Sequence, residues 1–124
     1  MQAIQVTIMS GVEDGVTLTY DGQRGDGQQS GDTWTLTIGR KDDNDIVLRH
    51  DTYVSRQHAR LHFFLNQQCW LEDCNSTNGT FIEDAVDYFN DQQVTGTIQI
   101  TLNQLLRIGR TWIRIETKAE ADNA

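Results

Sequence analysis

Apolar and polar residues alternate along short pieces of this chain. In Ala3–Met9 and Trp34–Ile38 the apolar residues recur at every second position, which is the pattern of a β-strand with one buried face. Clusters of Gly, Asn and Asp, typical of turns, separate such pieces. The pattern predicts strands at Ala3–Met9, Val16–Tyr20, Trp34–Ile38, Ile46–Leu48, His58–Leu65, Cys69–Glu72, Thr80–Ile82, Thr97–Leu102, Leu105–Ile108 and Trp112–Glu116. A helical stripe is hard to find, and the number and even spacing of the strands predict an all-β sandwich of two sheets.

Three segments depart from this alternation. Residues 21–33 contain four Gly and no apolar side chain, so we expect a mobile surface loop, or the long end of a hairpin, with nothing to anchor it to a core. Residues 85–96 are expected to form one helical turn or an irregular loop. Residues 118–124 are polar and predict a frayed tail. We therefore expect one domain over residues 1–117, followed by the tail.

The size and charge of the chain narrow the class of protein. A chain of 124 residues supports one hydrophobic core but not two. The net charge of -8 at pH 7 repels nucleic acid, whose binding depends on Lys and Arg. No stretch approaches the roughly 18 apolar residues of a membrane span, and the N-terminus lacks the basic start of a signal peptide. We expect a cytoplasmic protein that binds neither nucleic acid nor membrane.

The two cysteines, Cys69 and Cys74, favour neither a disulfide nor a metal site. Along one extended segment, their odd offset points the side chains to opposite faces, which disfavours a bond between them. Their spacing also differs from the C-x2-C pairs of zinc sites. We expect two free thiols, buried or partly buried, and no metal.

Three polar segments at strand ends carry the candidate chemistry, and they span residues 38–48, 54–61 and 73–81. Loops at one end of a rigid sandwich often hold binding residues. An arginine fork donates two parallel hydrogen bonds to phosphate oxygens, and hydroxyl or backbone N–H groups fill the remaining acceptor positions. The segments supply such a set, suited to a phosphate dianion, from Arg40, Ser55, Arg56, Ser76, Thr77 and Asn78.

The same segments carry three short motifs in order: Gly39-Arg40, then S-x-x-H from Ser55 to His58, then Asn78-Gly79. This series resembles the forkhead-associated (FHA) domain, and the resemblance covers about Leu36 to Glu116. It implies an FHA-like β-sandwich of about eleven strands whose loops at one end hold a phosphothreonine peptide. It also implies a monomeric module that acts in Ser/Thr kinase signalling, with no catalytic residue and no cofactor.

The resemblance assigns the ligand to five residues. Arg40 is expected to bind the phosphate through its guanidinium group, Ser55 through its hydroxyl, and Arg56 through its side chain or its backbone N–H. Thr77 is expected to approach the phosphate or the threonine methyl group. Asn78 is expected to hydrogen-bond the peptide backbone beside the phosphothreonine.

Three further residues of the motifs are expected to support the loops. In FHA domains the histidine at the position of His58 braces a loop and does not touch the ligand. Gly39 is expected to supply a turn with close backbone packing, and Gly79 the turn that presents Asn78.

Other interpretations stay open. A structural or oligomerising β-sandwich would use the same loops on an unphosphorylated partner, and a self-binding switch would bind a phosphorylated threonine of its own chain. A hydrolase would need Ser55, His58 and an aspartate as a triad, but Ser55 and His58 point to opposite sides if extended, and no G-x-S-x-G elbow surrounds the serine. His58 and His62 have a helical metal spacing, yet their segment reads as a strand, so we expect His62 to be solvated or braced.

Overall fold

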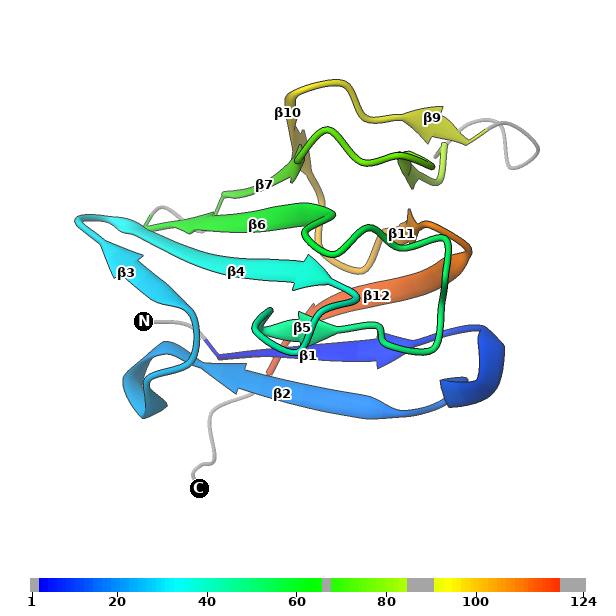
Figure 1. Cartoon of the computed structure of the whole chain (residues 1–124). Coiled ribbons are helices and arrows are strands. Elements are labelled where there is room, and N and C mark those ends of the chain that lie inside the picture. The colour runs from blue at the N-terminus through cyan, green and yellow to red at the C-terminus, as the bar shows by residue number, and fades with distance from the viewer. Residues whose placement is uncertain (1–2, 66–67, 85–90, 119–124) are drawn as a thin grey trace.

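The computed structural model of the chain describes residues 3–65, 68–84 and 91–118. Within these residues, twelve strands form two sheets that pack on one another (Figure 1). The predicted all-β sandwich is confirmed, with slightly more strands than the FHA resemblance led us to expect. The helical segments of the described residues are two 3-10 turns, and neither has the length or the apolar character to cross a membrane: η1 (Gly11–Glu13) and η2 (Gly22–Arg24).

Each sheet has six strands. The first has the order β2-β1-β12-β11-β8-β9, and its strands are β1 (Ala3–Ile8), β2 (Thr17–Asp21), β8 (Thr80–Ile82), β9 (Gln92–Gln93), β11 (Leu105–Ile108) and β12 (Thr111–Thr117). The second has the order β10-β7-β6-β4-β3, with β5 also paired to β4, and its strands are β3 (Gln28–Ser30), β4 (Thr33–Gly39), β5 (Ile46–Val47), β6 (Ala59–Phe64), β7 (Cys69–Asp73) and β10 (Thr97–Ile100). The pairing of β4 with β5 is parallel and the other pairings are antiparallel.

The core lies between the sheets because the alternation turns one face of each long strand inward. In β1 the side chains of Ile4, Val6 and Ile8 are buried, and in β4 those of Trp34 and Leu36. Full burial of one such side chain stabilises the fold by about 1.5–3 kcal/mol. The sheets therefore form a rigid support for the loops at their ends.

Residues 21–33 are anchored, contrary to the expectation that nothing there could attach to the core. The segment contains η2 and β3, and β3 pairs with β4 in a short hairpin. The flanking strands β2 and β4 lie in different sheets, so the segment is not the end of a hairpin between them. The indole N–H of Trp34 donates to the carbonyl of Asp26 at 2.7 Å. A Cβ at Gly27 would lie 2.7 Å from the Trp34 nitrogen. The segment is therefore anchored by the Asp26 carbonyl and by Gly27, which both contact the buried Trp34 ring. This anchor requires no apolar side chain from the segment.

The other predicted strands agree with the observed ones within two residues at each end. The predictions missed β9, which lies in residues 85–96, the segment expected to be a helical turn or an irregular loop. This strand pairs with β8. Residues 85–90 of that segment lie outside the described residues. In the predicted tail, Lys118 donates its backbone N–H to Ala3, and residues 119–124 also lie outside the described part of the chain.

The strand directions bring several loops to one end of the sandwich. The register pairs Ile38 at the end of β4 with Ala59 at the start of β6, and Ala59 with Asp73 at the end of β7. The segments 40–45, 48–58 and 74–79 therefore meet at one end, which lies at the right of Figure 1. We call these three segments the cradle loops.

Candidate functional site

The cradle loops bring together the five residues that were expected to contact a ligand. Arg40 follows β4 directly, and its backbone N–H donates to the carbonyl of Ser55 at 3.0 Å. The hydroxyl oxygen of Ser55 accepts the backbone N–H of Thr77 at 3.1 Å. The Asn78 side chain donates to the carbonyl of Tyr53 at 3.0 Å. Segments far apart in the sequence are thus joined by hydrogen bonds that the candidate residues make to one another and to Tyr53.

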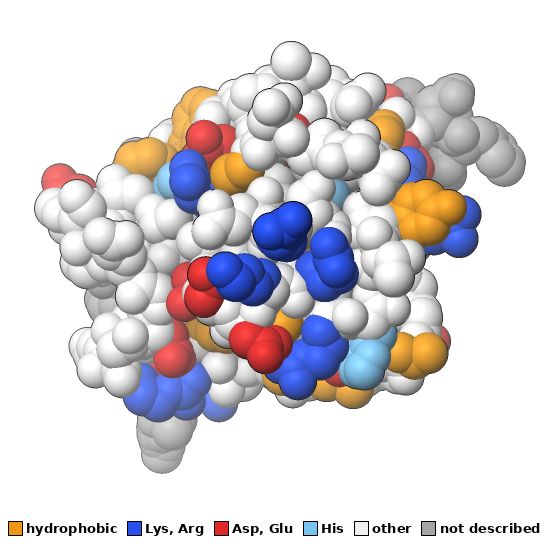
Figure 2. Space-filling model, viewed as in Figure 1, with side chains coloured by type: hydrophobic (Ala, Val, Ile, Leu, Met, Phe, Trp, Pro, Cys, Tyr) orange, Lys and Arg blue, Asp and Glu red, His pale blue; other side chains and the backbone are white. Residues whose placement is uncertain are grey.

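Two of the basic side chains on the cradle loops lack an anionic partner. Arg40 and Arg56 are exposed, and among the described residues neither forms an ion pair. The neighbouring cations are paired: Lys41 lies 3.8 Å from Asp43, and Arg49 lies 3.1 Å from Asp42. Figure 2 shows Lys and Arg side chains gathered over the loops around β5, with acidic side chains among them. Among the described residues, the positive charge without an acidic partner at this end therefore comes from Arg40 and Arg56, and from Arg110, whose guanidinium lies over the Tyr53 ring and donates to the Tyr53 hydroxyl.

The Arg40 guanidinium group is fixed along one edge only. Its Nε donates to the carbonyl of Val54 at 3.0 Å, and its two Nη groups have no hydrogen-bond partner among the described residues. Guanidinium N–H groups only donate, and two Nη groups match the spacing of two phosphate or carboxylate oxygens. The geometry leaves the fork of Arg40 free to bind an anion.

The Ser55 hydroxyl and the Asn78 amide also keep free hydrogen-bonding capacity. Because Ser55 Oγ accepts from Thr77, its own proton is available to donate to a ligand. Asn78 uses one amide hydrogen on Tyr53 and keeps its carbonyl oxygen and its second hydrogen. An amide with a free carbonyl oxygen and a free N–H is able to accept from and donate to an extended peptide backbone.

His58 joins two of the cradle loops from underneath. Its side chain is fully buried. Its Nδ1 accepts the backbone N–H of Ser55 at 2.9 Å, so its Nε2 carries the proton and donates to the carbonyl of Gly79 at 2.9 Å. Burial lowers the pKa of His58 below its ordinary value, which keeps the ring neutral. Ser55 and His58 were expected to point to opposite sides if their segment is extended. The segment bends instead, and the His58 ring accepts the backbone N–H of Ser55.

Gly39 allows the closest backbone approach at this site. A Cβ at this position would collide with the carbonyl oxygen of Arg56 and would lie 2.5 Å from the side-chain nitrogen of Asn44. That nitrogen donates to the carbonyls of Lys41 (2.8 Å) and Arg56 (2.7 Å). Asn44 is only 8% exposed and binds two cradle loops together. Sequence reasoning missed Asn44, because its partners are backbone atoms that no motif identifies.

The Asn78-Gly79 turn rests on a small polar network. The Asp73 carboxylate accepts the hydroxyl groups of Ser76 (2.5 Å) and Thr80 (2.7 Å), and Ser76 Oγ accepts the backbone N–H of Gly79 at 3.1 Å. Burial raises the pKa of Asp73, but these hydrogen bonds outweigh it and hold the pKa below its ordinary value. Gly79 has a φ of 91°, which favours glycine. Ser76 was grouped with the candidate phosphate-binding residues. Its hydroxyl group instead forms hydrogen bonds inside the turn.

His62 and the cysteines lie outside this site. On β6, the His62 ring bonds Thr35 through Nδ1 and Glu72 through Nε2, both at 2.9 Å, so it is braced as expected. Cys69 and Cys74 are free, the first buried and the second half-buried. Burial raises the pKa of Cys69 to about 12. Within the described residues, no group of three His, Cys, Asp or Glu side chains is placed to hold a metal ion.

Comparison with known proteins agrees with the motifs. The family model of the FHA domain matches residues 36–109. FhaB of Mycobacterium tuberculosis (strain H37Rv), an FHA domain-containing protein, is 37% identical over 80 residues, which are 64% of this chain and 46% of FhaB. The chain therefore spans about half the length of the curated relatives it matches.

Solved structures share the fold over nearly the whole chain. The crystal structure of the FHA domain of CT664 from Chlamydia trachomatis has a TM-score of 0.71 and 22% identity, and the match covers 94% of this chain and 99% of that one. A structure from an analysis of phosphothreonine-dependent FHA domain interactions has a TM-score of 0.66 and 26% identity, with 94% and 98% covered. With the family model matching more than half of its residues, the chain belongs to the FHA domain family.

Proposed function

We propose that this domain binds phosphothreonine in partner proteins, through Arg40, Ser55, Arg56, Thr77 and Asn78. The observation that carries the proposal is the pair of guanidinium groups, on Arg40 and Arg56, that have no anionic partner among the described residues, beside a serine hydroxyl with a free proton. FHA domains are binding modules, and the relative at 26% identity was solved in work on phosphothreonine-dependent interactions.

The phosphate is bound by charge-assisted hydrogen bonds. The two Nη groups of Arg40 donate to phosphate oxygens, the Ser55 hydroxyl donates to a further oxygen, and Arg56 adds its side chain or its backbone N–H. A hydrogen bond to a charged group contributes about 1.5–3 kcal/mol. Several of them supply most of a micromolar affinity, which corresponds to about −8 kcal/mol.

The remaining residues give the peptide its place and direction. Thr77 lies beside Ser55 through the bond from its backbone N–H, so its side chain approaches the phosphate or the threonine methyl group. Asn78 pairs with the peptide backbone next to the phosphothreonine. Gly39, His58 and Gly79 hold the loops and do not touch the ligand.

The site binds without catalysis. A serine nucleophile needs a base within hydrogen-bonding reach of its hydroxyl proton. The His58 nitrogen nearest Ser55 is occupied by the serine backbone N–H, and its other nitrogen is occupied by Gly79. The Ser55 hydroxyl therefore acts as a donor to the ligand.

Phosphothreonine is produced by Ser/Thr kinases, so the partner is a kinase substrate or a phosphorylated kinase, and the domain acts in Ser/Thr kinase signalling. A monomeric state, a cytoplasmic location and the lack of binding to nucleic acid or membrane stay predictions, as do the domain limits at residues 1–117.

Titration calorimetry against a degenerate phosphothreonine peptide pool tests the proposal, with unphosphorylated and phosphoserine pools as controls. We expect micromolar binding that requires the phosphate. It should weaken below about pH 6, where the phosphate becomes a monoanion. Equal affinity for the unphosphorylated pool would reject the proposal and favour the structural or oligomerising alternative, for which analytical ultracentrifugation of the domain is the next measurement.

A further inference from the structure

The outward face of the first sheet has a polar part and an aromatic part. On β1 and β2 the outward side chains are small or polar, as is usual for the solvent face of an antiparallel sheet: Ala3, Gln5, Thr7, Thr17, Thr19 and Asp21. On β8, β11 and β12 the outward positions hold two aromatic rings, a leucine and two arginines: Phe81, Leu105, Arg107, Trp112 and Arg114. We call these five residues the aromatic face.

The two rings of the aromatic face are held in place by a cation between them. The register places Arg107 between Phe81 and Trp112, and its guanidinium lies 4.0 Å from the centre of the first ring and 5.6 Å from that of the second. Its Nη groups bond the carbonyl of Gly109 at 3.1 Å and the Asp91 carboxylate at 3.5 Å. Arg107 is therefore already paired, and its cation–π contacts fix two apolar rings side by side.

Arg114 lies on the same face and has no such partner. Its Nε is buried and has no hydrogen-bond acceptor among the described residues, and its guanidinium forms no ion pair with them. The register places Arg114 between Thr7 and Leu105, and neither of these side chains is charged. A buried donor without an acceptor is unfavourable, and such a group in a native fold calls for an explanation. The aromatic face therefore carries a cation that the fold itself does not satisfy.

The carboxylates around the aromatic face limit what can pair with Arg114. Glu83 accepts a backbone N–H of β11 at 3.0 Å, and Asp91 is paired with Arg107. Glu116 faces outward two residues beyond Arg114 on β12. These three groups repel a segment that is rich in acidic residues. The face is therefore complementary to one carboxylate with apolar side chains beside it.

We propose that the aromatic face binds a partner protein through a segment that presents a single Asp or Glu beside aromatic or aliphatic side chains. The guanidinium fork of Arg114 pairs with the carboxylate, and the Phe81 and Trp112 rings contact the apolar side chains. Trp and Arg are enriched among the residues that dominate the binding energy of protein interfaces. The interaction does not require phosphothreonine, because the aromatic face lies on the outside of the first sheet and the proposed phosphothreonine site lies on the cradle loops.

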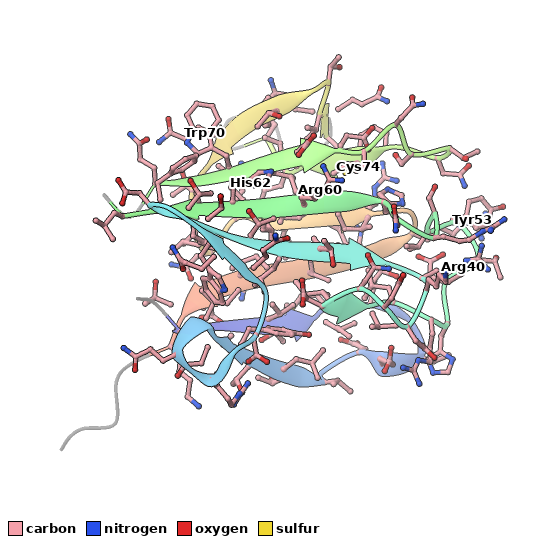
Figure 3. The ribbon with its side chains drawn as sticks, turned by 60° about the vertical axis from the view of Figure 1, so that its left-hand side comes forward. Arg40, Tyr53, Arg60, His62, Trp70 and Cys74 are labelled. Carbon is pink, nitrogen blue, oxygen red and sulfur yellow. The ribbon has the colours of Figure 1, made fainter. Side chains whose placement is uncertain are left out.

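The test is selection of unphosphorylated random peptides, displayed on phage, by the wild-type chain, Arg114→Met and Arg60→Met. Methionine keeps the unbranched side chain and removes the donors. Arg60, labelled in Figure 3, is the matched control, because it faces outward from β6 in the second sheet and is paired with Glu72 at 3.4 Å. We expect the wild type and Arg60→Met to enrich peptides with one Asp or Glu beside apolar residues, and Arg114→Met to lose this enrichment. For one enriched peptide, Arg114→Met should bind about tenfold more weakly, as expected for a lost charge-assisted hydrogen bond.

A charge reversal separates binding from a structural role of the same side chain. Arg114→Glu should enrich peptides with Lys or Arg in place of the acidic residue, which a merely structural arginine would not produce. Thermal unfolding of Arg114→Met should occur at or above the temperature of the wild type, because the substitution removes a buried donor that has no acceptor. Loss of the enrichment therefore reports on binding and not on misfolding.

The remaining outcomes separate this proposal from phosphothreonine binding. Amide chemical shifts of the ¹⁵N-labelled domain should change on β8, β11 and β12 when an enriched peptide is added. Arg40→Ala should bind that peptide as the wild type does. The proposal is overturned by the absence of an acidic and apolar consensus, by equal binding of the peptide to Arg114→Met, or by its displacement with a phosphothreonine peptide. None of these results changes the proposed binding of phosphothreonine.

Discussion

Two polar, irregular segments of this domain are held in different ways. The β5–β6 loop, residues 48–58, is bonded to residues far away in the sequence: Asp51 to Thr111, Tyr53 to Asn78, and Ser55 to Thr77. The segment between β2 and β3 is bonded largely to itself, since Asp21 accepts from Gln23 and Asp26 accepts from Arg24. The difference teaches that a binding loop takes its shape from the rest of the fold, whereas a local turn carries its shape in its own residues.

The largest effect on peptide affinity should come from removal of the Arg40 guanidinium group. Replacing Arg40 with Ala should weaken phosphothreonine binding by about 2–4 kcal/mol, because the phosphate charge is left underpaired. Calorimetry with one phosphothreonine peptide measures this. Arg49→Ala is the matched control, since Arg49 is already paired with Asp42, and it should change affinity little. Equal losses in the two variants would point to a diffuse electrostatic attraction.

The next largest effect should come from closing the space between two cradle loops. In Gly39→Ala the new methyl group meets the carbonyl of Arg56, and overpacking of this kind costs about 1–3 kcal/mol. We expect a lower free energy of unfolding in urea and weaker binding. Gly31→Ala is the comparison, because a Cβ at Gly31 meets nothing within 4 Å. That variant should bind normally and lose only the stability due to its left-handed backbone, about 1–2 kcal/mol.

Removal of the buried amide should give a smaller loss. Asn44→Ala leaves the carbonyls of Lys41 and Arg56 without their donor, at a cost of about 1–2 kcal/mol. We expect the loss in both unfolding free energy and peptide affinity, because Arg56 loses its support. A variant that is destabilised but binds normally would show that the amide serves the fold alone.

The buried histidine predicts how stability varies with pH. Burial lowers the pKa of His58, so below the ordinary histidine pKa of about 6.5 the unfolded chain takes up the proton more readily than the folded one. Stability should be full above that pH and should fall as the pH drops toward the folded pKa, by at most about 1.4 kcal/mol per pH unit. Urea unfolding between pH 7.5 and 5 measures the slope. His58→Gln should flatten it, and an unchanged slope would exclude His58 as its source.

The smallest effect on peptide affinity should come from a substitution in the segment between β2 and β3. Asp26→Asn weakens the pair with Arg24, whose side chain is largely exposed, and exposed pairs contribute about 0–1 kcal/mol. The bond from Trp34 goes to the Asp26 backbone and remains. Peptide affinity should therefore be unchanged. A measurable loss of affinity would mean that this segment is coupled to the cradle loops, contrary to the comparison above.

The sequence predicted the features that follow from the alternation of apolar and polar residues and from the three motifs. The sandwich followed from period-two burial, and the grouping of Arg40, Ser55 and Asn78 followed from three motifs at strand ends. Asn44 and Asp51 were missed, because their partners, several backbone groups and the Thr111 hydroxyl, are brought near only in the folded chain. The anchoring of residues 21–33 was missed for a related reason: the contact uses a carbonyl and a glycine. The one available signal was Trp34, whose buried indole N–H requires an acceptor.

The pairing of β1 with β12 has a mechanical consequence. Ala3 and Lys118 are hydrogen-bonded neighbours, and the register runs from Ile4 with Thr117 to Ile8 with Ile113. The described chain thus begins and ends at the same end of the sandwich, opposite the cradle loops (Figure 1). Tension applied through both connections would load the ladder one pair at a time and peel it open, and it would not shear all the pairs together. The domain should therefore yield to weak pulling along its own chain, while a pull through a bound peptide enters the fold at the other end.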